Sequence, residues 1–272
     1  MSGSTHSERE RIIEAYGRRD EAGVSSKFRL SDPAFLFHIQ ERERAFLRAL
    51  REEGFPIGSA SILEVGCGTG HVLARFLEFG ARSATGVDLA PWRLAEAKGQ
   101  YPLLRLVRAD GAELPFADGS FDLVAQFLCL SSILDDSMRR CVGREMWRVL
   151  RPGGLLLSYD LRPATAGSRA FFLGYYALRR LAAVFHGRTA EKNRGEGAGE
   201  VPPVTPTRSI DLREIRDLFP GGVLRCEPVS LDYRLASLAG KHPVPGQLLS
   251  GVPFLRTHYL AVVRKPAAGG KS

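Results

Sequence analysis

The stretch SILEVGCGTGHV at positions 61–72 constrains the fold more than any other part of the sequence. Its first half is an apolar run that predicts a buried strand, and a helical pattern begins at His71. Between them, Gly66, Gly68 and Gly70 form the pattern G-x-G-x-G. Such a turn lets the backbone approach a ligand closely, and the helix N-terminus offers free N–H groups. The stretch therefore predicts a nucleotide-type ligand at the end of a strand.

Strand and helix patterns alternate on both sides of this turn. Strands are predicted over 61–66, 83–89, 104–110, 121–130 and 155–161, and helices over 33–53, 71–80, 91–100, 137–150, 170–185 and 209–219. The strands are almost continuously apolar, which favours a parallel sheet covered by helices on both faces. Two late strands, at 223–233 and 257–266, are expected to form a hairpin across an insertion.

The same patterns divide the chain into five parts. We expect an N-terminal helical cap (1–57), a cofactor-binding Rossmann-like core (58–161), a helical and loop lid over the substrate (162–208), a helix and strands that complete the sheet (209–266) and a disordered tail (267–272). The lid assignment rests on residues 187–208, which are rich in glycine, proline and charge and poor in large apolar residues.

Composition narrows the functional classes only slightly. The net charge of +8 favours anionic partners such as nucleic acid, phosphate-bearing metabolites or a membrane surface. Many of the arginines alternate with glutamates in 40–53, however, which is typical of a solvated helix face, so specific nucleic-acid binding is not expected. The N-terminus has no signal-peptide pattern and no apolar run reaches ~18 residues, so we expect a cytoplasmic protein without a membrane span.

The four cysteines are scattered without metal-ligand spacing. They are expected to be free thiols in a reducing compartment, and no metal site is predicted. Cys67 lies inside the glycine turn, where a small buried residue is expected rather than a nucleophile.

Two residues refine the identity of the ligand. A dinucleotide-binding turn has the pattern G-x-G-x-x-G, and His71 occupies the position of its last glycine. This disfavours NAD and suits a ligand without a pyrophosphate. Asp88 ends the second strand, about 20 residues beyond the turn, where a carboxylate can accept hydrogen bonds from both hydroxyls of a ribose.

Three motifs in order resemble one family. The segments ILEVGCGTG (62–70), ADGAELPFADGSFDLV (109–124) and EMWRVLRPGGLLLSYD (145–160) are similar to the class I S-adenosylmethionine-dependent methyltransferases, and closest to the methyltransferase type 11 group. The resemblance implies an α/β, Rossmann-like fold with a mostly parallel seven-stranded sheet, helices on both faces and a C-terminal antiparallel hairpin. It also implies S-adenosylmethionine as cofactor and S-adenosylhomocysteine as product.

Matching the family motifs residue by residue implies a set of cofactor contacts. Around the methionine part these are Glu64, Gly66, Cys67, Gly68 and Gly70. Around the ribose and adenine they are Asp88, Leu89, Asp110, Gly111 and Ala112. Gln126 and Phe127 are expected to line the cofactor and face the acceptor, and Tyr16, with Arg18 or Arg19, to close over the carboxylate end.

The resulting hypothesis is methyl transfer to a small-molecule acceptor by in-line displacement, at oxygen or carbon, with catalysis mainly by positioning. Asp160 and His258 are candidate catalytic groups, because Asp160 leaves a strand at its carboxyl end and an imidazole titrates near neutrality. Residues 161–199 contain seven Lys or Arg and two Glu, which suits an amphipathic or anionic acceptor. A monomer or a homodimer is expected.

Two alternative functions remain open. Enzymes that methylate nucleic-acid amines usually carry a polar-Pro-Pro-aromatic run after the fourth strand, and this chain has QFLCLSS at 126–132, which disfavours that activity. A cofactor-binding chain that serves as a non-catalytic partner subunit is the second alternative.

Overall fold

The computed structural model describes residues 2–23, 31–185, 205–233, 235–236 and 243–268. In chain order the elements are α1 (Ser2–Glu21), α2 (Pro33–Glu52), η2 (Ile57–Ser59), β1 (Ser61–Val65), α3 (His71–Glu78), β2 (Ser83–Asp88), α4 (Pro91–Gln100), β3 (Arg105–Arg108) and β4 (Phe121–Phe127). They continue with η3 (Leu130–Ser132), α5 (Asp136–Val149), β5 (Leu150–Leu161), α6 (Ala166–Phe185), α7 (Leu212–Leu218), β6 (Val223–Leu231), α9 (Pro243–Ser250), η4 (Pro253–Leu255) and β7 (Arg256–Arg264).

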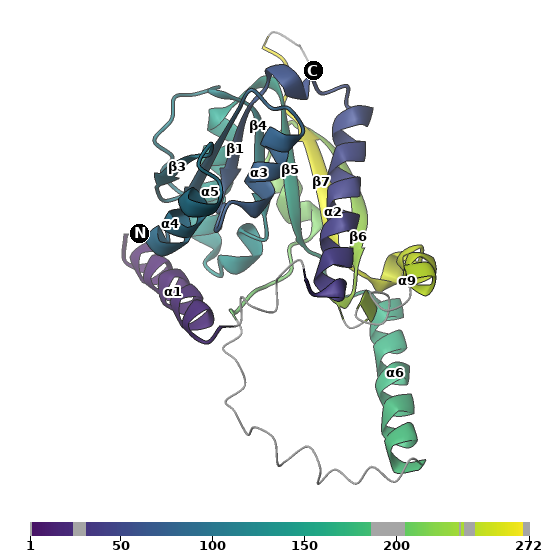
Figure 1. Cartoon of the computed structure of the whole chain (residues 1–272). Coiled ribbons are helices and arrows are strands. Elements are labelled where there is room, and N and C mark those ends of the chain that lie inside the picture. The colour runs from purple at the N-terminus through teal and green to yellow at the C-terminus, as the bar shows by residue number, and fades with distance from the viewer. Residues whose placement is uncertain (1, 24–30, 186–204, 234, 237–242, 269–272) are drawn as a thin grey trace.

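Seven strands form one sheet in the order β3-β2-β1-β4-β5-β7-β6 (Figure 1). The pairs from β3 to β5 are parallel, and β7 runs antiparallel to both β5 and β6. The predicted mostly parallel seven-stranded sheet with a C-terminal antiparallel hairpin is confirmed. The order reverses between β1 and β4, and the carboxyl ends on either side of such a reversal are where ligands bind in open α/β sheets.

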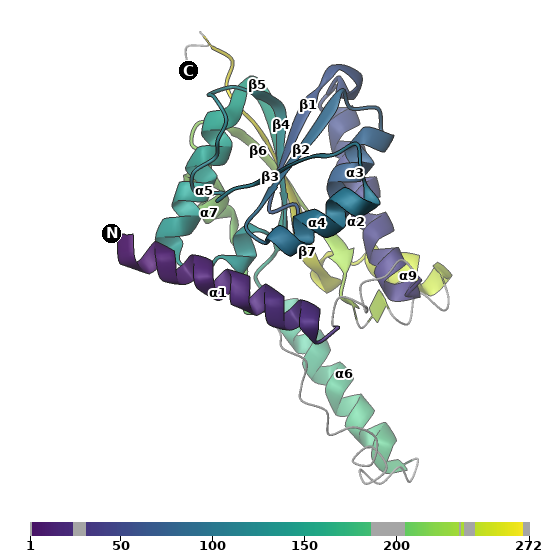
Figure 2. The same ribbon diagram turned by 60° about the vertical axis from the view of Figure 1, so that its left-hand side comes forward.

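Alternate residues of each central strand pack into separate layers. In β1, Leu63 and Val65 join a core with α5 and α7, whereas Ile62 joins a core with α2 and α3. Figure 2 shows these two helix layers on opposite faces of the sheet. Because both faces of the strands are buried, their sequences are apolar throughout rather than alternating.

β5 and α6 begin earlier than the sequence predicts. β5 begins at Leu150 instead of residue 155, and its pairing with β4 shifts register between Phe121 and Leu123. The first part of β5, RPGG, has a sequence typical of a turn. Gly153 has φ +74° and supplies the irregular backbone there. α6 begins four residues earlier than predicted, at Ala166.

Two helices lie outside the layers. α1 crosses the edge of the sheet at the carboxyl ends of the parallel strands, and α6 extends away from the sheet (Figures 1 and 2). Most of the loop predicted within the lid lies outside the described residues, while Thr205 near its end and Ile210 just after it are buried. Among the described residues, no helix combines the length and apolar character needed to cross a membrane.

Candidate cofactor and acceptor site

A cavity of about 1110 Å³ opens at the carboxyl ends of β1, β2 and β4. The glycine turn forms one wall, and α1 and α2 form others. We call the part lined by the glycine turn, Asp88 and Asp110 the cofactor side, and the part lined by Phe35, His38, Tyr159 and His258 the acceptor side, after the roles proposed for them below.

The three turn glycines all have positive φ, at 74°, 52° and 75° for Gly66, Gly68 and Gly70. At Gly66 an added Cβ would lie 2.7 Å from the Cys129 sulfur, and at Gly70 it would lie 2.8 Å from the Leu104 side chain. Gly66 therefore brings the turn against the η3 segment, and Gly70 brings the start of α3 against the β3 side of the sheet. Gly66 and Gly68 line the cavity, whereas Gly70 supports the turn from behind.

Asp88 ties the turn to the next strand. Its Oδ2 accepts a hydrogen bond from the Gly68 N–H at 2.8 Å, and its Oδ1 accepts one from the Ala90 N–H at 2.9 Å. Each carboxylate oxygen keeps a second lone pair. Asp88 lines the cavity, so it can hold the turn and a pair of ligand hydroxyls together.

The far end of the cofactor side is an apolar slot with one acid. Leu89, Ile133, Met138 and Val142 line it beside Asp110. Asp110 Oδ1 accepts from the Ala112 N–H at 2.8 Å, and Oδ2 pairs with Arg9 of α1. A flat heteroaromatic ring with an amino group suits such a slot. Gly111 lines the cavity, and Ala112 supports Asp110 instead of lining it.

Two buried ionisable side chains on the cavity wall keep polar atoms without a hydrogen-bond partner among the described residues. Arg42 is 7% exposed, and its Nε and Nη2 have no hydrogen-bond partner among the described residues. Glu64 is 2% exposed, and its Oε2 is likewise unpaired within the described part of the chain. Burial raises the pKa of Glu64 to about 8, while Arg42 opposes the rise. Buried polar atoms are rarely left unpaired, so these two groups fit a ligand that carries both an ammonium and a carboxylate group.

The sequence analysis missed Arg42. The residue lies on the buried face of α2, three residues after Ile39 and four before Phe46, and its guanidinium lies over the rings of Phe127 and Tyr159 at 5.4 and 5.8 Å. An arginine at a core position of an amphipathic helix was the signal that could have identified it, since arginine is almost never fully buried without a role.

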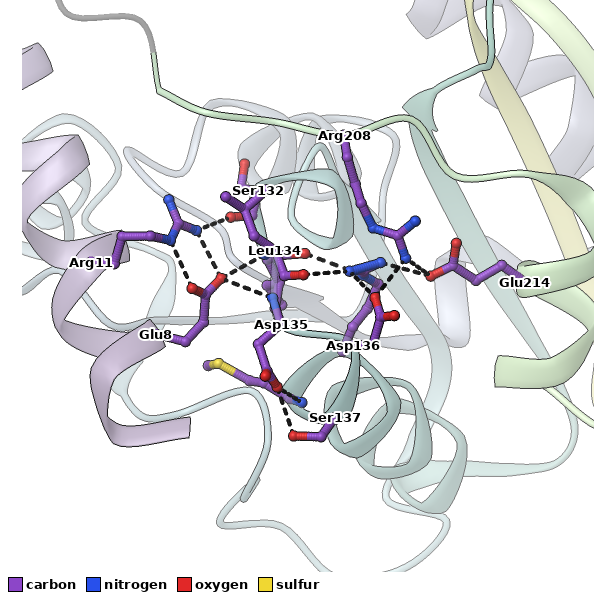
Figure 3. Close-up of polar contacts among 12 residues, drawn as sticks. Glu8, Arg11, Ser132, Leu134, Asp135, Asp136, Ser137, Arg208 and Glu214 are labelled. Atoms are coloured by element: carbon purple, nitrogen blue, oxygen red, sulfur yellow. Dashed lines mark hydrogen bonds and ion pairs between the residues drawn. The ribbon is translucent and has the colours of Figure 1, made fainter. Parts of the chain in front are cut away.

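α1 is held on the rim of the cavity by a polar clasp (Figure 3). Glu8 Oε1 accepts from the backbone N–H groups of Leu134 and Asp135 at 2.5 and 3.3 Å, and Arg11 donates to the Ser132 carbonyl at 2.6 Å. Further along α1, the Tyr16 hydroxyl lies 2.9 Å from Ser132 Oγ. The clasp positions Tyr16 in the cavity lining.

On the opposite side of the cavity, aromatic and imidazole rings pack tightly. His258 stacks on Tyr159 with centroids 4.8 Å apart and an angle of 7°, and His38 lies edge-on to His258 at 4.9 Å. The Tyr159 hydroxyl contacts His38 Nε2 at 2.9 Å and Ser230 Oγ at 2.7 Å. Burial lowers the pKa of His38 to about 4 and that of His258 well below its ordinary value, so both rings are neutral at pH 7. His38 was not singled out as a site residue from the sequence.

Two further expected site residues lie behind the cavity wall. Gln126 accepts from the Cys129 N–H at 2.9 Å and donates to Ser158 Oγ at 2.6 Å. Asp160 accepts from the Leu161 and Ser131 N–H groups at 2.9 and 3.1 Å, and burial raises its pKa to about 6. Neither residue is part of the cavity lining. Both hold the β4–η3 connection, which carries Phe127 and Leu128 into the cavity.

Two cysteines lie on the cavity wall. Cys67 and Cys129 are free thiols on the cavity wall, and burial raises the pKa of both. In the part of the chain that the structure describes, no three His, Cys, Asp or Glu side chains are grouped as metal ligands.

Comparison with known proteins places this fold in a functional class. A family model described as a methyltransferase domain matches residues 62–154. The malonyl-[acyl-carrier protein] O-methyltransferase of Enterobacter lignolyticus (strain SCF1) is 32% identical over 140 residues, which are 50% of this chain and 53% of the relative. An uncharacterized methyltransferase of Mycobacterium avium (strain 104) is 37% identical over 153 residues, which are 52% of this chain and 57% of the relative. The chain thus spans about half the length of these curated relatives.

Solved structures agree on the fold. An S-adenosylmethionine-dependent methyltransferase from Mesorhizobium loti aligns with a TM-score of 0.51 and 21% identity, covering 80% of this chain and 96% of that one. The family match over residues 62–154 and the sheet order together identify this part of the chain as a class I S-adenosylmethionine-dependent methyltransferase domain. The cofactor of this class is S-adenosylmethionine, and the unpaired atoms of Arg42 and Glu64 on the cavity wall suit the carboxylate and ammonium groups of its amino-acid end.

Proposed function

We propose that this protein transfers the methyl group of S-adenosylmethionine to an oxygen or carbon atom of a small-molecule acceptor. The observation that carries the proposal is that two buried ionisable side chains on the cavity wall, Arg42 and Glu64, keep polar atoms without a hydrogen-bond partner among the described residues. Arg42 would bind the carboxylate of the methionine part and Glu64 its ammonium group. Asp88 would bind the ribose, and Asp110 with the apolar slot would bind the adenine.

When bound, the cofactor supplies an activated methyl group on a sulfonium. The protein's own residues then align the acceptor and exclude water, and alignment can supply on the order of 7–11 kcal/mol of the barrier. We assign the acceptor to the side lined by Phe35, His38, Tyr159 and His258. α1 would act as the cap, and the first turns of α6 would form part of the acceptor cover.

Of the two candidate catalytic residues, His258 suits proton removal better. It lines the cavity and is neutral at pH 7, and its Nδ1 lies 3.0 Å from Thr257 Oγ1, which leaves Nε2 as the ring nitrogen for an acceptor proton. Because an imidazole of low pKa is a weak base, it suits an acceptor whose hydroxyl is itself acidic. We assign Asp160 a positioning role, since its carboxylate already accepts several hydrogen bonds.

The acceptor would be amphipathic or anionic, and we propose that the chain works in the cytoplasm as a monomer or a homodimer. The malonyl-[acyl-carrier protein] O-methyltransferase relatives support a small acidic acceptor, and the free cysteines suit a reducing compartment.

The proposal is tested with S-adenosylmethionine that carries a deuterated methyl group. The purified protein is incubated with this cofactor and a small-molecule extract of the source cells, and products are analysed by mass spectrometry. A labelled small molecule supports the proposal and identifies the acceptor. Label only in nucleic acid, or tight cofactor binding without any labelled product, would favour a nucleic-acid methyltransferase or a non-catalytic partner subunit respectively.

Loosening the clasp of α1 should weaken cofactor binding. Glu8→Ala leaves the Leu134 and Asp135 N–H groups without their acceptor, and an unpaired buried donor costs about 1–3 kcal/mol. We expect the Kd for S-adenosylmethionine to rise roughly tenfold by calorimetry, and trypsin to cut α1 faster. Glu14→Ala is the matched control, because Glu14 forms only an exposed pair with Arg18 at 3.5 Å. Equal effects of the two substitutions would contradict a docking role for Glu8.

Cofactor binding should release a proton through Glu64. Its pKa of about 8 means that the ligand-free carboxyl is mostly protonated at pH 7, whereas a bound ammonium group favours the carboxylate. The free protein therefore holds a proton that the complex gives up, and affinity should increase as the pH rises from 6 to 8. Calorimetry at pH 7 in buffers of different ionisation enthalpy should detect this proton. The release should disappear in Glu64→Gln; an unchanged release would assign it to another group.

A further inference from the structure

One end of the molecule, formed by α6, α9 and η4, exposes large apolar side chains. Leu173 and Leu178 of α6 are 73% and 69% exposed, and Leu248 of α9 is 73% exposed. Tyr176 and Phe254 are also exposed. In both views of the chain, α6 extends away from the sheet and α9 lies near its base (Figures 1 and 2). We call the surface of these three elements the apolar end.

The first turns of α6 pack against the rest of the described chain. Phe171 lies 6.2 Å from Phe254, and Phe171 and Phe172 pack on the small core that contains Leu255. Beyond these contacts, exposed apolar residues continue along the helix. A helix with apolar residues around most of its circumference is normally buried or bound to an apolar phase, so the apolar end needs a partner.

The charge of the apolar end indicates which kind of partner it binds. Among the described side chains of these three elements, Arg169 is charged and exposed, and the sequences of the elements contain neither Asp nor Glu. Two copies of the chain that met through this surface would bring like charges together. An interfacial helix, by contrast, combines arginine with exposed leucine and aromatic residues. We propose that the apolar end binds the surface of an anionic lipid bilayer, with α6 lying in the headgroup region.

The apolar end lies close to the acceptor side of the cavity, so bilayer binding could serve methyl transfer. The core under α6 includes Phe37 and Leu235, and the cavity on its acceptor side is lined by the nearby Phe35 and Tyr233. A bilayer at the apolar end would therefore lie beside the acceptor side and could supply an amphipathic acceptor. That consequence rests on the proposed function, but binding to the bilayer does not.

The test is flotation of the full chain with vesicles, without cofactor. Vesicles of phosphatidylcholine alone are compared with vesicles that also contain phosphatidylglycerol. We expect binding to the anionic vesicles that weakens in high salt, and at least tenfold weaker partitioning to phosphatidylcholine. Leu173→Ser combined with Leu178→Ser should lower partitioning at least tenfold, and so should Arg169→Glu.

Matched controls separate this surface from general stickiness. Leu103→Ser removes an 85% exposed leucine outside the apolar end, and Arg144→Glu reverses an exposed charge on α5; both should bind vesicles like the unmodified chain. No flotation at millimolar lipid, equal binding to both vesicle types, or equal loss in the control variants would overturn the proposal. So would a dimer, detected by light scattering, that the double leucine substitution dissociates, because that result assigns the surface to a second copy. Flotation tests bilayer binding and needs no methyl transfer. A variant that loses methyl transfer without lipid therefore bears on the proposed function, and its flotation still decides the question of bilayer binding.

Discussion

Arg42→Met is expected to weaken S-adenosylmethionine binding about 30-fold or more while leaving the ligand-free protein at least as stable as before. The expected loss reflects a carboxylate of the ligand that loses its buried partner, which costs about 2–5 kcal/mol. Stability should not fall because the Arg42 Nε and Nη2 have no hydrogen-bond partner among the described residues when the ligand is absent. Replacing a poorly paired buried charge by an apolar side chain is often neutral or stabilising.

A second buried arginine provides the control. Arg139 is 1% exposed but fully paired: its guanidinium donates to the carbonyls of Ile133 and Leu134 and to the carboxylates of Asp136 and Glu214. Arg139→Met breaks this buried network and should lower the free energy of unfolding by about 3–5 kcal/mol. Urea unfolding and calorimetry on both variants measure the contrast. If Arg42→Met destabilised the protein as Arg139→Met does and left the Kd within threefold, Arg42 would be a structural residue and not a cofactor ligand.

Gly66→Ala should be the most damaging small substitution in the turn. A Cβ at this position would lie 2.7 Å from the Cys129 sulfur and 2.8 Å from its Cβ, and φ is +74°. Left-handed backbone costs an alanine about 1–2 kcal/mol, and overpacking adds about 1–3 kcal/mol. We expect a total loss of roughly 2–5 kcal/mol in the free energy of unfolding, with cofactor affinity reduced more than tenfold because the turn must shift.

Gly153 has the same φ of +74°, but nothing lies within 4 Å of an added Cβ. Gly153→Ala therefore reports the backbone cost alone, about 1–2 kcal/mol, and should leave cofactor affinity unchanged. Thermal unfolding of the two variants separates close packing from backbone strain. If both variants lost the same stability and bound the cofactor normally, the close contact between the turn and Cys129 would not be needed for cofactor binding.

The sequence predicted more of the residues that line the cofactor side of the cavity than of those that line its acceptor side. Gly66, Gly68, Asp88 and Asp110 lie in local motifs, at or just after strand ends, and all four line the cavity. Arg42 and His38 come from a helix far from those motifs in the sequence, and only the packing of α2 against the sheet brings them to the cavity. Asp160 shows the opposite case, because a strand-end acid that suggests catalysis is held behind the wall by backbone N–H groups.

The sequence by itself determined the parallel half of the sheet, since apolar strands, glycine turns and helices follow one another locally and connections of this kind have one handedness. It also determined the methyltransferase class through motifs of contiguous residues. Tertiary structure alone decided that β7 inserts between β5 and β6, that Glu8 fastens α1 over the cavity, and that α6 extends from the body with its leucines exposed. The physical reason is distance along the chain: these features depend on which surfaces meet after the core has formed, and no local pattern of residues encodes that meeting.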